Sequence, residues 1–192
     1  MIHATQTCAA GLAGLRDLEE SEIEVIVGYW FGGGADLAFL GIDTARLSDA
    51  AAARDRFRQW LRRGDKAQAS MVYAITLDGD MVGYTNLNQY GVIGYSHWHI
   101  IRRDVRAGGI SSALYPHRIK MYFDTSNIER LVHQTRTRNV GVNRMLDKYV
   151  PAAETLQVEK PDGLALPGEF HIRYVTRADV PTLFARAREF EK

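Results

Sequence analysis

The chain has 192 residues, a length typical of one domain, since domains usually contain roughly 100–200 residues. Its 24 Lys and Arg residues balance 23 Asp and Glu residues, which leaves a net charge of +1 and no field that would gather nucleic acid or membrane phosphates. A single cysteine, Cys8, excludes an internal disulfide framework and a zinc site built from several cysteines. We therefore expect one domain over residues 1–192 in a reducing compartment.

No targeting or membrane-spanning segment is expected. Residues 25–42 are apolar enough to raise the question, because a spanning helix needs ~20 such residues. They also contain Asp36 and five glycines, which favours a turn-rich loop. The first residues lack the basic region of a signal peptide. The sequence predicts a cytoplasmic protein with no membrane or nucleic-acid partner.

Two helices are expected first along the chain. Ser21-Glu22-Ile23-Glu24 reads as a capping box, in which the serine and the glutamate satisfy exposed amides of the first turn. Apolar residues then recur at i, i+3, i+4 and i+7 up to Trp30, and glycines 32–34 end the helix. A second helix is expected at 48–63, where Gly64 provides the stop signal.

The middle of the chain changes to a strand pattern. Residues 71–77 and 81–88 flank Asp78-Gly79-Asp80, a strong hairpin signal, and residues 95–101 continue as a third strand. The remaining expected elements are a helix near 109–123, a strand near 128–134, a helix from Asn139, strands near 154–159 and 169–175, and a helix at 179–191. This order predicts a mixed α/β sheet covered by helices.

The most informative stretch is residues 100–112, where a strand ends, glycines follow and a helix opens. Such a turn points free backbone amides and the positive end of the helix dipole into one small space, so it can bind an anion. An ordinary glycine turn has the same spacing. A P-loop and a dinucleotide turn are both excluded, because neither G-x-x-x-x-G-K-[ST] nor G-x-G-x-x-G is present.

The motif Arg106-x-x-Gly109-x-Ser111 resembles the pyrophosphate loop of the GNAT N-acetyltransferase superfamily, with Ser111 as a small residue where the family carries Gly or Ala. Residues 138–148 are similar to the asparagine-led helix of the ribosomal-protein (RimJ/RimL-like) branch. The order of elements over residues 15–176 also matches. The resemblance implies a mostly antiparallel sheet, splayed at the strand before the glycine loop, with helices on both faces.

The resemblance also implies acetyl-CoA as the co-substrate of an N-acyltransferase. Backbone amides of the loop would cradle its pyrophosphate; these belong to Arg106, Ala107, Gly108, Gly109, Ile110, Ser111 and Ser112. Backbone groups of Ile100 and Ile101 would bind pantetheine and polarise the acetyl carbonyl. Asn139 would touch the pantetheine arm or simply cap its helix, and Arg144 would meet an outer phosphate or remain a solvated charge.

Many members of the superfamily carry a tyrosine on the asparagine helix as general acid, and in this register Leu146 occupies that position. Tyr149 lies one helical turn away and is the substitute candidate, with release of thiolate to solvent as the alternative. Pro116 interrupts the helix after the glycine loop, beyond its first turn.

Proton acceptance is assigned to His97 and His99, because histidine titrates near neutrality and both lie on the strand that enters the acetyl site. Histidines packed for structural reasons are the alternative. A metal site of His97, His99 and His133 is a weaker alternative, since no Asp or Glu nearby in sequence supports it.

The amine acceptor is expected against the loop between the first two helices. Trp30 and Phe31 would form an apolar wall, and Asp36 would attract an ammonium group, although a core tryptophan and a loop carboxylate explain them equally. The acceptor is a small-molecule amine or a peptide or protein amine. The competing hypothesis is a catalytically idle coenzyme A-binding or protein-interaction module, and the C-terminal helix is a candidate homodimer contact.

Overall fold

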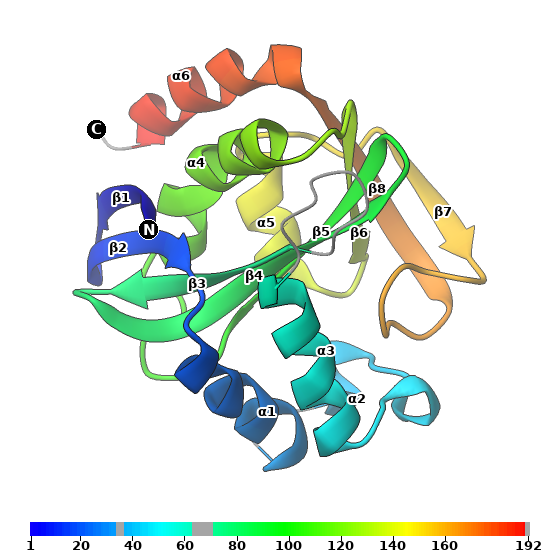
Figure 1. Ribbon diagram of the computed structural model, residues 1–192. Coiled ribbons are helices and arrows are strands. Elements are labelled where there is room, and N and C mark those ends of the chain that lie inside the picture. The colour runs from blue at the N-terminus through cyan, green and yellow to red at the C-terminus, as the bar shows by residue number, and fades with distance from the viewer. Residues whose placement is uncertain (34–36, 63–70, 191–192) are drawn as a thin grey trace.

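The computed structural model describes residues 1–33, 37–62 and 71–190. Within them an eight-stranded sheet has the order β1-β2-β3-β4-β5-β6-β8-β7 (Figure 1). The strands are β1 (Ile2–Cys8), β2 (Gly11–Asp17), β3 (Met71–Leu77), β4 (Asp80–Tyr90), β5 (Ile93–Ile100), β6 (Arg130–Arg136), β7 (Glu154–Val158) and β8 (Gly168–Thr176). Every neighbouring pair is antiparallel except β5 and β6.

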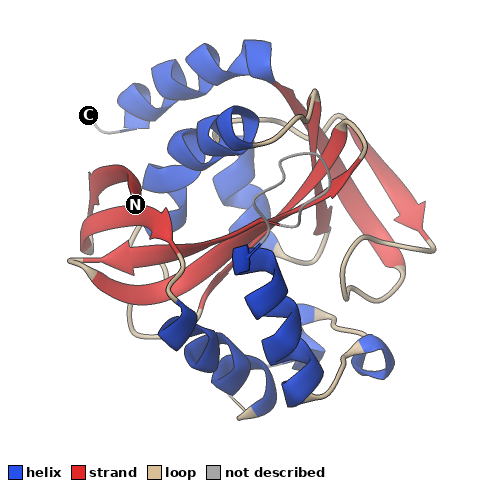
Figure 2. Cartoon of the chain, viewed as in Figure 1, coloured by secondary structure: helices blue, strands red, loops and turns tan. Residues whose placement is uncertain are grey.

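Helices cover both faces of the sheet, as the resemblance implied (Figure 2). One face carries α1 (Ile23–Phe31) and α3 (Ala50–Arg62), and the other carries α4 (Ile110–Thr125), α5 (Val140–Asp147) and α6 (Val180–Phe190). The short α2 (Leu37–Leu40) and the 3-10 turns Glu20–Glu22, Thr44–Arg46 and Arg177–Asp179 join these elements.

Strand alternation explains why the two faces have separate cores. In β4, Tyr84 points toward Phe57 of α3, whereas its neighbour Thr85 contacts the hydroxyl of Tyr122 in α4. Leu87, on the same face as Thr85, is fully buried in the core beneath α4 and α6.

Two N-terminal strands were not expected from the sequence, and Cys8 ends the first of them. The pattern is hard to read because Ala13, Gly14 and Leu15 are buried in succession, so β2 shows no alternation of apolar and polar residues. The capping box is also corrected. It joins Glu19 and Glu22, which places the start of the helical segment two residues earlier than Ser21.

The other expected elements are present with ends shifted by up to two residues, and Pro116 lies inside α4 as expected. Arg63 and Glu191, the expected last residues of the second and the C-terminal helix, lie outside the described residues. No helix in the described part of the chain is both long and apolar enough to cross a membrane.

The expected splay lies between β5 and β6. Their parallel pairing covers only Ile93–Tyr95 against Arg130–Val132. Beyond this point each strand continues, β5 beside β4 and β6 beside β8, without the other as a partner. The sheet therefore opens along one edge of β5, toward the glycine turn.

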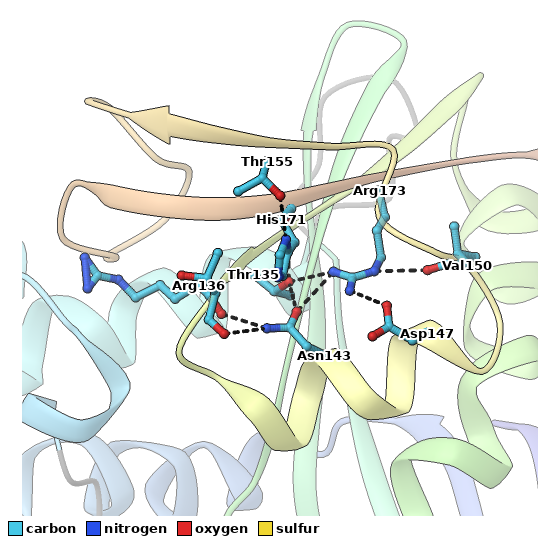
Figure 3. A network of polar contacts seen from close by, with 9 residues as sticks. Thr135, Arg136, Asn143, Asp147, Val150, Thr155, His171 and Arg173 are labelled. Atoms are coloured by element: carbon cyan, nitrogen blue, oxygen red, sulfur yellow. Dashed lines mark hydrogen bonds and ion pairs between the residues drawn. The ribbon is translucent and has the colours of Figure 1, made fainter.

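A buried arginine fastens α5 beside this opening (Figure 3). The guanidinium of Arg173, 1% exposed, donates to the Val150 carbonyl at 3.0 Å, to the Thr135 hydroxyl at 2.8 Å and to the Asn143 side-chain oxygen at 3.1 Å. It also pairs with Asp147 at 2.6 Å. Because these partners come from β6, α5 and the segment after α5, one side chain sets the position of the helix.

Replacement of Arg173 by Met should lower the free energy of unfolding by about 3 kcal/mol, because the Thr135 hydroxyl would lose its donor and the Asn143 side-chain oxygen would lose one of its two donors. Chemical denaturation measures this. The matched control is Lys120→Met, which removes an exposed ion pair with Asp124 and should cost about 0.5 kcal/mol or less. Equal losses in the two variants would show that the arginine network does not anchor α5.

Candidate functional site

A cleft of about 1490 Å³ lies at the splay of the sheet. Its floor is formed by β4 and β5, one wall by α1 and α3, and the opposite end by the glycine turn and the start of α5. The loop between β7 and β8 contributes residues 162–165. The cleft thus collects segments from almost the whole chain around the free edge of β5.

The glycine turn leaves the start of α4 uncapped. Gly109, at the N-cap position, has φ +84° and provides no side-chain cap, and Ala107 has φ +65°. The first bond inside the helix joins the Ala113 amide to the Gly109 carbonyl at 2.9 Å. The amides of the preceding helical residues, Ile110–Ser112, are therefore directed out of the helix end, where an anion can accept their hydrogen bonds.

Two amides expected to bind a pyrophosphate are already used within the turn. The Arg106 amide donates to the Arg103 carbonyl at 3.2 Å, and the Gly108 amide donates to the Val105 carbonyl at 3.3 Å. The expectation for these two amides is therefore wrong. Those of Ala107 and Gly109–Ser112 form the candidate cradle.

The N-terminal hairpin supports the turn from behind. The Ala10 amide donates to the Gly108 carbonyl at 3.1 Å, and a Cβ added at Gly108 would lie only 2.6 Å from the Cβ of Ala10. Gly108 is needed for this close approach, and Gly109 for its positive φ. The unexpected strands β1 and β2 thus hold the loop in place.

The edge of β5 that faces the splay carries free backbone groups, but not those of Ile101. The Ile101 amide donates to the Val82 carbonyl of β4 at 2.8 Å, so it cannot also polarise an acetyl carbonyl, which corrects that expectation. Strand alternation turns the amides of Trp98 and Ile100 toward the open side. The carbonyl of Ile100 accepts a hydrogen bond from the Arg106 side chain at 3.0 Å.

The start of α5 forms another part of the cleft wall. Asn139 is the N-cap, and its side-chain oxygen accepts a hydrogen bond from the Val142 amide at 3.3 Å. Asn139 also lines the cleft, as do the cations Arg138, Arg144 and Lys148. The cap role is therefore present, and contact with a ligand is compatible with it.

Tyr149 does not take the place of the missing acid. Its side chain is 3% exposed, it is not among the cleft-lining residues, and its hydroxyl donates to the Ser112 carbonyl at 2.9 Å. It ties the segment that follows α5 to the first turn of α4. Leu146, at the position where the resemblance implies a tyrosine, is fully buried.

His97 and His99 both line the cleft, but their surroundings differ. His99 stacks on Tyr84 at 5.2 Å between ring centroids and meets the edge of Trp30 at 5.0 Å. Burial, together with the nearby positive charges of His97 and Arg106, lowers the pKa of His99 to about 3. His99 is thus neutral at physiological pH and too weak a base for efficient proton transfer.

His97 contacts a carboxylate that the local sequence does not reveal. Its Nε2 lies 2.6 Å from Oδ2 of Asp162, whose side chain is 7% exposed. Burial raises the pKa of Asp162, but the hydrogen bond and charge of His97, with further hydrogen bonds, lower it more, so the net pKa lies below its ordinary value. In the sequence, Asp162 is one residue of a Pro-Asp-Gly loop, and turn residues of this kind carry no signal for a partner 65 positions away.

The third histidine of the metal alternative faces the other side of the sheet. His133 is 1% exposed, and its Nε2 lies 3.0 Å from the hydroxyl of Tyr115 in α4. Burial lowers its pKa well below the ordinary value. The set of His97, His99 and His133 therefore does not converge on one ligand.

The expected acceptor wall is present in part. Trp30 and Phe31 line the cleft, and the indole of Trp30 donates to the Tyr84 hydroxyl at 2.8 Å. Asp36 lies outside the described residues. Among the described residues that line the cleft, the single carboxylate is Asp162, while the cations are Arg46, Arg56, Arg106, Arg136, Arg138, Arg144 and Lys148.

Solved structures share this fold over their whole length. RimJ of Mycobacterium smegmatis, in complex with CoA-disulfide, aligns with a TM-score of 0.76 at 15% identity over 100% of this chain and 95% of that one. RimL, a ribosomal L7/L12 α-N-protein acetyltransferase in complex with coenzyme A, aligns at 0.71 and 16% identity over 92% and 98%. A GNAT-family acetyltransferase from Bacillus anthracis aligns at 0.65 and 14% over 92% and 98%. The chain therefore has the GNAT fold.

No protein-family model matches the sequence, and no curated protein matches it in a sequence search. At 14–16% identity, the likeness to the solved structures establishes the shared architecture of this chain and leaves its chemistry to be argued from the residues of the cleft.

The depressed pKa of His99 should appear in the acid stability of the protein. The unfolded chain binds a proton at His99 below about pH 6.5, whereas the folded chain does so only near pH 3, so acid favours unfolding throughout this window. His99→Gln should reduce the loss of stability by up to about 1 kcal/mol per pH unit, measured by denaturation at several pH values. Identical slopes in both proteins, or an imidazolium at His99 in NMR spectra at pH 5, would contradict the assignment.

Proposed function

We propose that this GNAT-fold chain is an acetyl-CoA-dependent N-acetyltransferase that transfers the acetyl group directly to a primary amine in a ternary complex. The observation that carries the proposal is the meeting of an uncapped helix start and a free strand edge in one cleft. Coenzyme A needs both, because its diphosphate requires amide donors and its pantetheine arm contains amides that pair with an extended strand. RimJ and RimL, which share the fold, are in complex with forms of coenzyme A.

The residues of the cleft fit the parts of this co-substrate. The amides of Ala107 and Gly109–Ser112 would hold the diphosphate, and Arg138 and Arg144 lie among the cations available to its outer phosphate. Asn139, at the start of α5, lies where it can contact the pantetheine arm while it caps the helix.

The thioester supplies an activated acetyl group, and the chain supplies its environment. The Ile100 amide, on the open edge of β5, can donate to the carbonyl oxygen as negative charge develops there, an effect of ~3 kcal/mol on the barrier for one such donor. His97 is placed in the same cleft to accept a proton from the amine. With Leu146 buried and Tyr149 bound to Ser112, the thiolate is released without a tyrosine acid.

A catalytically idle coenzyme A-binding module is the competing function, and the buried Leu146 is the observation that favours it. Release of free thiol from acetyl-CoA across an amine panel separates the two. Thermal stabilisation by acetyl-CoA without turnover of any amine would support the module.

We also propose that the protein acts in the cytoplasm as a single domain and forms a homodimer through its C-terminal helix.

The acceptor is an amine that carries negative charge close to its nitrogen. Arg46 and Arg56 line the acceptor side of the cleft near α3, and neither is paired with a carboxylate among the described residues. On the same helix, by contrast, Arg54 pairs with Glu24 and Arg58 with Glu20. Free amino acids and acidic peptide N-termini, such as a protein acceptor would present, both have this chemistry.

Ser111→Asp should weaken acetyl-CoA binding and preserve the fold. A carboxylate in the first turn of α4 competes with the diphosphate for the same amides, although an acidic residue at a helix start stabilises the helix. The KM for acetyl-CoA should rise at least about tenfold, equivalent to about 1.4 kcal/mol. Ser111→Ala is the control and should change KM by less than about twofold. An unchanged affinity in Ser111→Asp would place the diphosphate elsewhere.

Arg56→Gln should lower kcat/KM for an amine that carries a carboxylate, by about tenfold, and leave a neutral amine of the same size unaffected. The matched control, Arg54→Gln, removes an arginine whose partner is Glu24 on α1 and should leave both rates unchanged. Steady-state kinetics with a free amino acid, its neutral analogue and a pair of acidic and neutral peptides measures the preference. Equal rates for charged and neutral acceptors in the unmodified enzyme would contradict the assignment of acceptor charge.

A further inference from the structure

The side chain of Asp162 is held rigidly in the cleft wall. Its Oδ2 lies 2.6 Å from Nε2 of His97 and accepts a hydrogen bond from the Asn88 amide group at 3.1 Å. Its backbone amide donates to the side-chain oxygen of Gln134 in β6 at 3.0 Å. Contacts with side chains of β4, β5 and β6 therefore hold Asp162 in one orientation. The carboxylate in turn holds the imidazole of His97 that faces it.

This contact determines which nitrogen of His97 is available for chemistry. An ionised carboxylate accepts hydrogen bonds only, so Nε2 must carry the proton and donate it to Asp162. The lone pair then lies on Nδ1, for which the described residues provide no hydrogen-bond partner. Gly163, with φ +68°, lies against the ring, where an added Cβ would be 3.3 Å from Cε1. The side chain of His97 is 30% exposed, which leaves the ring accessible from the cleft.

The loop that carries Asp162 is joined to the acceptor wall. The Asp43 amide donates to the Leu164 carbonyl at 2.7 Å, and the Leu166 amide donates to the Gly41 carbonyl at 2.8 Å. Ile42 and Ala165 pair between these bonds as an isolated antiparallel bridge. The partner of His97 is therefore supplied by a loop that is bonded to the segment around Ile42, and Ile42 itself lines the cleft.

The charged and titratable groups around His97 come from several elements. His99 lies two residues away on β5 and is neutral, and His133 of β6 is also neutral because of burial. The hydroxyl of Tyr90 at the end of β4 interacts with Asp162. The positive charge of Arg46 opposes the rise in the pKa of Tyr90 that burial and Asp162 cause. Asp162 is thus the single carboxylate in contact with the ring among the residues described.

We propose that Asp162 is the positioning residue that holds His97 with Nε2 protonated, so that Nδ1 accepts the proton of the acceptor amine. This inference rests on the proposed function. The ammonium nitrogen gives one proton to Nδ1, and the imidazolium formed is stabilised by Asp162. The neutral amine then forms the N–C bond as the C–S bond breaks, and its second proton leaves with the thiolate as the thiol. His97 returns its proton to water.

Asp162→Asn tests the role while the shape of the side chain is kept. The amide group can donate to Nε2, which favours the opposite tautomer and places the proton on Nδ1. We expect kcat to fall about 100-fold, within the range for loss of a general base, while the KM for acetyl-CoA stays unchanged. The acidic limb of the kcat/KM profile should also move to lower pH, because the imidazolium has lost its carboxylate partner. Asp162→Glu should recover part of kcat.

The control is Asp124→Asn, which removes a carboxylate paired with Lys120 and Arg177 at the C-terminal end of α4 and should leave both kcat and the pH profile unchanged. Nitrogen-15 NMR of the imidazoles provides a readout independent of turnover. It should show His97 with the proton on Nε2 in the unmodified protein and on Nδ1 in Asp162→Asn.

The outcomes separate the two proposals. Turnover by the unmodified protein, with kcat and the acidic limb retained in Asp162→Asn, overturns the positioning role and leaves the acetyltransferase proposal standing. A protein that releases no thiol with any amine overturns the proposed function and the proton transfer together. A purely structural role of Asp162 would lower thermal stability but would not move the pH limb or reverse the tautomer.

Discussion

The end of parallel pairing between β5 and β6 is the constraint on which the cleft depends. After Tyr95 and Val132 the two strands no longer share hydrogen bonds, and one edge of β5 must find other partners or remain open. A strand edge left unpaired inside a protein is costly unless a ligand or water satisfies it. The same opening places the uncapped start of α4 beside the free edge, so two incomplete hydrogen-bonding surfaces face one space.

Remote parts of the chain hold this opening in shape. The N-terminal hairpin supports the glycine turn through Ala10 and Gly108, and the buried guanidinium of Arg173 fixes α5 against β6 and β8. At the other end of the cleft, the loop around Ala165 pairs with Ile42 and places Asp162 against His97. The glycine turn is thus recognisable from its local sequence although remote segments support it, whereas the pair of His97 and Asp162 forms only through contacts between segments distant in sequence.

That division explains what the sequence predicted. The helical period before Trp30, the Asp-Gly hairpin and the glycine turn are local patterns, and they predicted most elements and the splayed fold correctly. The hairpin β1–β2 was missed because successive buried small residues show no strand period. Asp162 was missed because a turn residue gives no sign of its distant partner, and Ile101 was misassigned because strand alternation alone does not reveal which edge faces β4.

Amide chemical shifts of the nitrogen-15-labelled protein during titration with acetyl-CoA test whether the uncapped start of α4 and the free edge of β5 bind this co-substrate together. We expect large, saturable shifts at Ala107, at Gly109–Ser112 and at the open-edge amide of Ile100, with small shifts in β1 and β7. Saturable binding that leaves the amides of residues 107–112 unshifted, or no binding at all, would contradict this role of the cleft.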